Sequence, residues 1–217
     1  MGYLLSYPRS GIHLVRVLIE ALTLRPTSAL YTITGDDLAL TLRNGAAERL
    51  GVDVSLPPHF YKVHRLAHLG GAIDRSAPLV FLLRDPFECI SSDFRRVPHL
   101  FLRMSGRWRE EWDKVVENVR EFDGWRAPKL LLHSEDLAAA PAAPIRSLGR
   151  FLAVDDGRIE EVVAGFGDVS GTALRSLLRP PRSHADPSYY RSRTWFPAPL
   201  NAPAGLERYF ERYNSVG

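Results

Sequence analysis

The sequence predicts an α/β fold in which a parallel sheet is covered by helices on both faces. Two observations support this prediction. Short apolar runs alternate along the chain with longer segments of helical periodicity, and residues 79–83 (LVFLL) are apolar on both faces, which is typical of a parallel strand buried on both sides. A chain of 217 residues with 45% hydrophobic and 24% charged residues can form one sizeable core. We therefore expect a single domain over residues 1–217, with ligands at the carboxyl ends of the strands.

The predicted strands are short and are bounded by turn residues or by helical segments. The first of them is broken by Pro8 and Gly11. In order, the strands are predicted at residues 4–7, 60–64, 79–83 and 129–133.

The predicted helices follow the strands and carry apolar residues at a spacing of three or four. We expect Asp36 or Asp37 to cap the second helix and Gly51 to end it, and we expect Pro86 to start the third helix at its first position. In order, the helices are predicted at residues 12–24, 36–50, from 86 onward, and at 108–122, 144–152, 158–166 and 205–213. Residues 179–204, rich in Pro, Arg and Ser, are expected to form an irregular lid or a flexible segment.

Composition narrows the classes of partner. The chain has a net charge of +3, and its basic residues are mostly Arg, the side chain best suited to forked contacts with phosphate or sulfate. No basic stripe interleaved with aromatic residues is present, so we expect no nucleic-acid partner. Cys89 is the sole cysteine, which excludes an intramolecular disulfide and fits a reducing, cytoplasmic compartment. The apolar runs are shorter than the ~20 residues that span a bilayer, so no membrane span is expected.

Residues 6–13 (SYPRSGIH) place a Gly and a short hydroxyl residue between a strand end and a helix start. The backbone N–H groups at such a helix start are unpaired and carry the positive end of the helix dipole, which favours a phosphate ligand. Arg9 would add a cation and Ser10 a hydroxyl donor. The alternative is a plain strand–helix turn with Ser10 as the helix cap, and the residues alone leave both open. The GxxxxGK[ST] pattern is absent, which argues against an ordinary NTPase.

The run YPRSG at residues 7–11 resembles the 5′-phosphosulfate loop of sulfotransferases that use 3′-phosphoadenosine-5′-phosphosulfate (PAPS). The resemblance implies a P-loop-like sulfotransferase architecture with PAPS as the sulfuryl donor and no metal. Family members often carry hydroxyl residues at the positions of Ile12 and His13. The resemblance thus implies backbone contacts to the phosphate from Gly11, Ile12 and His13, and the His13 ring N–H is a further candidate donor.

The run RDPFECISS at residues 84–92 resembles the family's 3′-phosphate segment, in which an Arg ends a strand and a Ser follows eight residues later. Arg84 and Ser92 match those positions. An Arg at a strand end and a Ser about two helical turns on can reach one phosphate. Without the resemblance, Arg84 would be a common strand exit and Ser92 a surface residue.

Two later segments resemble the family less closely. Ser134 stands in the run LLLHSEDL where the family usually has a Tyr that faces the nucleotide. The family's C-terminal signature is missing, and YRSRTW at residues 190–195 is the only stand-in. Its Arg191 and Arg193 are candidates to hold the 3′-phosphate, with solvated surface residues as the alternative.

The run YKVH at residues 61–64 resembles the strand end that carries the family's base. Lys62 and His64 would point to one face of a strand. A neutral imidazole can take the proton of an acceptor hydroxyl, and His59 and His68 nearby are the competing histidines. Lys62 would neutralise charge on the oxygen that leaves.

The resemblance therefore implies in-line sulfuryl transfer to a hydroxyl of a small molecule or glycan. Two alternatives remain. One is a catalytically inactive nucleotide-binding protein of the same fold. The other is a small-molecule kinase, which would require a Lys in the glycine loop and a carboxylate for magnesium, for which Asp85 is the candidate.

Overall fold

The computed structural model describes residues 1–29, 50–67, 69, 73–93, 106–170 and 202–214. The predicted helix at 36–50 lies outside the described residues except for Leu50. Most of the predicted segment at 179–204, with Arg191 and Arg193, also lies outside them. Within the described ranges, no helix is both long enough and apolar enough to cross a membrane.

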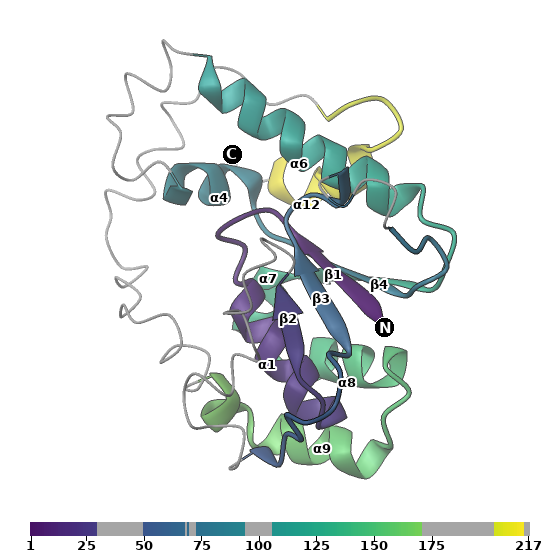
Figure 1. Ribbon diagram of the computed structural model, residues 1–217. Helices are drawn as coiled ribbons and strands as arrows, with labels where there is room; N and C mark the ends of the chain where they lie inside the picture. Colours follow the sequence, from purple (N-terminus) through teal and green to yellow (C-terminus); the bar gives the residue numbers. More distant parts are fainter. Residues whose placement is uncertain (30–49, 68, 70–72, 94–105, 171–201, 215–217) are drawn as a thin grey trace.

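A parallel sheet forms the centre of the described structure, as the sequence predicts (Figure 1). Its strands are β1 (Gly2–Ser6), β2 (Thr27–Ala29), β3 (Phe60–Val63), β4 (Leu79–Leu83) and β5 (Lys129–His133). The predicted bounds of β4 and β5 are confirmed, whereas β1 and β3 each end one residue before the predicted bound. The short strand β2 was not predicted, because Thr-Ser-Ala is not an apolar run.

The strand order is β2-β3-β1-β4-β5, with every neighbouring pair parallel. The chain leaves β1 toward the β2 edge of the sheet, and it leaves β4 toward β5 at the opposite edge. Ligands of open α/β sheets bind at the carboxyl ends of strands where the direction of connection reverses in this way. The segments after β1, β3 and β4 are therefore neighbours at the carboxyl end of the sheet, where ligands of such folds bind.

One face of the sheet is covered by α1, α7, α8 and α9 (Figure 1). These are α1 (Ile12–Thr23), α7 (Ser134–Ala139), α8 (Ala142–Phe151) and α9 (Asp156–Ala164). The predicted helices at 12–24, 144–152 and 158–166 are confirmed to within two residues at each end. Helix α7 was not predicted, because it is short and follows β5 without a break.

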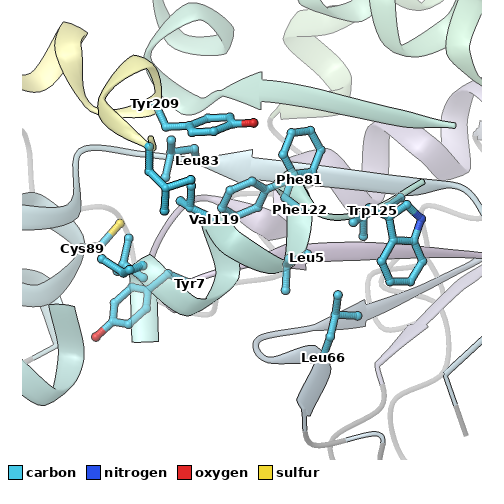
Figure 2. Packing of buried hydrophobic residues seen from close by; sticks show 14 of the residues in the cluster. Leu5, Tyr7, Leu66, Phe81, Leu83, Cys89, Val119, Phe122, Trp125 and Tyr209 are labelled. Carbon is cyan, nitrogen blue, oxygen red and sulfur yellow. The ribbon is translucent and has the colours of Figure 1, made fainter. Parts of the chain in front are cut away.

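The other face is covered by α4 (Pro86–Asp93), α6 (Arg107–Asp123) and the C-terminal segment. Figure 2 shows part of this core, in which Phe122 of α6 packs against both Phe81 of β4 and Tyr209. The ring centroid of Phe122 is 5.3 Å from that of Phe81 and 6.2 Å from that of Tyr209. Burial of apolar side chains on both faces of the sheet supplies the main favourable term in folding.

The prediction of one helix at 205–213 is wrong. The structure has a 3₁₀ turn at Glu207–Tyr209 and a short helix α12 at Glu211–Asn214. The backbone N–H groups of Tyr209 and Phe210 bond to carbonyls three residues back, which is the 3₁₀ pattern. Tyr209, Phe210 and Tyr213 are all buried. This tighter winding accompanies the burial of three aromatic side chains within five residues.

Candidate functional site

The loop between β1 and α1 bends through two left-handed residues. Arg9 has φ 69° and Gly11 has φ 87°, and Gly11 is the N-cap of α1 without a side-chain cap bond. The hydroxyl of Ser10 donates to the Tyr7 carbonyl at 2.6 Å, so its proton closes the loop instead of capping the helix. The first turn of α1 contains no acidic residue. Its N–H groups thus present the positive end of the helix dipole without a nearby carboxylate on the same turn.

The residues at the two ends of this loop, Tyr7 and Gly11, lie close to side chains of other elements. The buried Tyr7 donates its hydroxyl to Glu111 of α6 at 2.7 Å. On the other side, a Cβ placed on Gly11 would lie 3.2 Å from the hydroxyl oxygen of Ser134, at the start of α7. The backbone conformation at position 11 therefore favours glycine, and any larger residue there would also make a tight contact with Ser134.

Arg84 lies at the carboxyl end of β4 and contacts the β1–α1 loop. Its Nη1 donates to the carbonyl of Arg9 at 2.9 Å, which joins the two segments that the sequence singled out for phosphate binding. Its Nε and Nη2 donate to Glu88 Oε2 at 3.1 and 2.7 Å. Glu88 was not predicted from the sequence, although its i,i+4 spacing from Arg84 at a helix start could have indicated the ion pair. Ser92 lies in α4, as the sequence predicts.

Asp85 is a helix cap. Its Oδ1 accepts the N–H of Phe87 at 2.9 Å, and its own N–H donates to Glu135 Oε1 at 2.8 Å. The other oxygen of Glu135 accepts the hydroxyl of Tyr213 at 3.2 Å. The turn that carries Arg84 is thus tied through Glu135 to the C-terminal segment. In the part of the chain that the structure describes, no cluster of three or more His, Cys, Asp or Glu could hold a metal ion.

His64 is the first residue after β3, and its ring contacts the end of β1. Its Nδ1 lies 2.7 Å from the carbonyl oxygen of Ser6. Since a carbonyl only accepts, Nδ1 must carry the proton and donate, which assigns Nε2 as the acceptor nitrogen of the neutral ring. The backbone carbonyl of His64 accepts from Asn118 Nδ2 of α6 at 2.9 Å. Nothing in the local sequence pattern indicated Asn118.

Lys62 is 7% exposed and lies on β3 in register with Leu4 of β1. Strand alternation places it on the face of Phe60, which packs with α1, whereas Val63 packs on the opposite face. Lys62 and the helix α1 therefore share one side of the sheet. A lysine this buried is rare unless it has a polar or charged counterpart, which marks the position as unusual.

His59 lies at the opposite, amino end of β3. Its N–H donates to the Pro26 carbonyl at 2.8 Å. Burial, with Arg25 and the N-terminus as further causes, lowers the pKa of His59 to about 4. His59 is thus neutral near pH 7. It lies at the other end of β3 from His64. His68 lies outside the described residues, and His13 is half-buried in the first turn of α1.

No family model and no curated protein matches the sequence. Solved structures do match the fold. Mouse sulfotransferase SULT7A1, crystallised with 3′-phosphoadenosine-5′-phosphate (PAP), aligns with a TM-score of 0.56 at 14% identity. The alignment covers 100% of this chain and 88% of that one. The sulfotransferase domain of the curacin biosynthetic pathway aligns with a TM-score of 0.55 at 18% identity over 98% and 96% of the two chains. Retinol dehydratase, in complex with androsterone and PAP, aligns with a TM-score of 0.51 at 16% identity over 98% and 78%.

These three structures match the fold over 98% to 100% of this chain. At such low identity the likeness concerns the fold and leaves the reaction to be argued from the residues. The chain has the sulfotransferase fold.

Proposed function

We propose that this chain is an enzyme that transfers the sulfuryl group of PAPS to a hydroxyl of a small molecule or glycan. One juxtaposition carries the proposal. The ring of His64, whose Nδ1–H donates to the Ser6 carbonyl, lies at the carboxyl end of the sheet, as does the N-terminus of α1 after Gly11. The first of these features suits a general base, and the second suits an anion. Two of the neighbours described above were crystallised with PAP, which supports a nucleotide of this class.

Residues at the carboxyl end of the sheet would contact the two phosphate groups of such a nucleotide. The loop around Arg9 and Gly11, with the N–H groups of Ile12 and His13, would hold the phosphate next to the sulfuryl group. Its left-handed bends and the absence of an acidic residue in the first turn of α1 favour an anion there. Arg84 and Ser92 would hold the 3′-phosphate, and Arg84 would then share its guanidinium between that phosphate and Glu88.

When bound, PAPS would supply an activated sulfuryl group with the bisphosphate nucleotide as the leaving group. His64 Nε2 would take the proton of the acceptor hydroxyl, because Nδ1 already carries its own proton. Lys62 and the first N–H groups of α1 would stabilise negative charge on the nucleotide side. Such fixed dipoles and charges act without reorganising during the reaction, so they lower the barrier by electrostatic preorganisation.

The test combines a binding assay and a turnover assay. Thermal unfolding is followed with PAP and, separately, with ATP and magnesium. A ligand at ~100 times its dissociation constant adds ~2.7 kcal/mol to the free energy of unfolding. We expect a clear shift with PAP and a small one with ATP. Incubation with ³⁵S-labelled PAPS and a panel of hydroxylated acceptors is expected to give labelled product, and His64→Ala serves as the control that retains the PAP shift.

Equal thermal shifts from PAP and ATP would remove the PAPS assignment. A PAP shift without labelled product from any acceptor, and without slow hydrolysis of PAPS, would favour the catalytically inactive nucleotide-binding protein.

A further inference from the structure

A buried amide on α6 contacts the segment that carries His64. Asn118 is 1% exposed, and its Nδ2 donates to the backbone carbonyl of His64 at 2.9 Å across 54 residues of sequence. Its Oδ1 is also buried, and among the described residues it has no hydrogen-bond partner. The neighbouring residues on the buried face of the helix are apolar, with Val115 and Val119 packed in the core under the sheet.

This arrangement does not stabilise the fold efficiently. A single neutral hydrogen bond returns little net free energy, whereas a buried oxygen without a partner incurs its full desolvation cost. An apolar side chain of similar volume at position 118 would avoid that cost. Residues that break a packing rule in this way are expected at functional sites, so the amide calls for an explanation other than stability.

The position of His64 supplies the explanation. The pairing of β1 with β3 ends at the Leu5–Val63 pair, so His64 lies beyond the parallel ladder. Its ring is oriented through Nδ1 to the Ser6 carbonyl, and its backbone carbonyl is held by Asn118. If the backbone rotated, the ring would move off Ser6, and the tautomer with Nε2 as acceptor would lose its support.

We propose that Asn118 is a positioning residue for His64, which it fixes by holding the backbone carbonyl at the end of β3. The proposal rests on the function proposed above for His64. Asn118 does not touch the reacting groups, and it acts through the orientation of the base. A base must lie within hydrogen-bond distance of the hydroxyl proton, and a misplacement of ~1 Å can reduce the rate ~100-fold.

The experiment compares Asn118→Leu with a matched control on the same helix, Val119→Ala. Asn118→Leu removes the bond to His64 and the oxygen without a partner, but keeps the branching and the number of heavy atoms of the side chain. Val119→Ala removes core packing and makes no bond to His64. We expect Asn118→Leu to lower kcat by ~10- to 100-fold, with PAP affinity unchanged and a melting temperature equal to or above that of the natural protein. Val119→Ala is expected to do the reverse, with a lower melting temperature and kcat retained.

Asn118→Ala is the second variant, for the case in which leucine at this position prevents folding. Each variant is also examined by ¹⁵N NMR of the histidine rings, with His64→Asn to assign the signal. We expect the Nδ1–H tautomer of His64 in the natural protein and in Val119→Ala, and a mixture of tautomers in both Asn118 variants.

The outcomes separate the two proposals. Unchanged kcat and an unchanged tautomer in both Asn118 variants would overturn the positioning role, as would a rate loss matched by an equal loss of PAP affinity. If the natural protein makes no sulfated product, the proposed function fails, and the tautomer of His64 in the two Asn118 variants still decides whether Asn118 positions the ring.

Discussion

Gly11→Ala is the substitution that tests the anion-binding loop most directly. Gly11 has φ 87°, so alanine would adopt a left-handed conformation that costs ~1–2 kcal/mol. The added methyl would also lie 3.2 Å from the Ser134 hydroxyl oxygen, a tight contact that a serine side chain can partly relieve by rotating. For a chain of this size, ~1 kcal/mol lowers the melting temperature by ~2–4 °C, so we expect a loss of ~2–8 °C.

The same methyl would enter the loop where a phosphate is proposed to sit. PAP at ~100 times its dissociation constant should raise the melting temperature of the natural protein by ~5–11 °C, since it adds ~2.7 kcal/mol. We expect Gly11→Ala to lose most of this ligand-induced shift. Isothermal titration calorimetry with PAP measures the affinity directly and confirms that the loss of shift is a loss of binding.

Gly106→Ala is the matched control for backbone strain. Gly106 is the N-cap of α6 with φ 69°, and a Cβ there would meet no atom within 4 Å among the described residues. We expect this variant to lose a similar amount of stability and to keep the full shift with PAP. If Gly11→Ala and Gly106→Ala respond to PAP alike, the loop after β1 is an ordinary strand–helix turn and the reasoning is refuted.

Three further predictions concern single side chains of the site and its surroundings. Arg84→Ala should weaken PAP binding by ~1.5–3 kcal/mol through loss of a charged hydrogen bond, and should weaken adenosine 5′-phosphosulfate less; calorimetry that finds equal losses would make Arg84 a fold residue that supports Arg9. His64→Ala should depress turnover ~10²–10⁴-fold with PAP affinity retained, whereas a loss of rate in His13→Ala alone, with normal binding, would transfer the role of base to His13. His59 has a folded pKa of about 4, below its unfolded value, so its contribution to stability is present above pH ~6.5 and is lost as the pH falls toward 4. Urea titrations across this range should show that the free energy of unfolding falls less in His59→Phe than in the natural protein. Identical pH profiles of the two proteins would contradict this role.

The sequence by itself determined the elements whose pattern of apolar residues is compatible with only one pattern of burial. Residues 79–83 carry no polar side chain, so they had to be buried on both faces, and the strand has these bounds. Helices at 12–24 and 108–122 followed from apolar residues at helical spacing, with ends that shifted by one residue because caps such as Leu24 depend on backbone geometry. The resemblance to the sulfotransferases indicated the fold, and the neighbouring structures confirm it.

Elements that depend on tertiary context escaped the sequence. Strand β2 is three small residues long and exists because it pairs with β3. The C-terminal segment carries a helical pattern, yet it winds as a 3₁₀ turn and a short helix with its aromatic side chains in the core. Pairing and packing energies exceed local propensity in segments this short, so their conformation cannot be read from their own residues.

The candidate site shows the same division. The sequence pointed to Arg9, Arg84 and His64 as chemical groups, but only the structure decided that Arg84 bonds to the carbonyl of Arg9 and that the His64 ring bonds to Ser6. It also decided that Glu88 pairs with Arg84 and that Asn118 holds His64. These contacts depend on the strand order, which places β1 between β3 and β4. Strand order is set by the burial of whole faces and by the hand of the crossovers, which no short run of residues encodes.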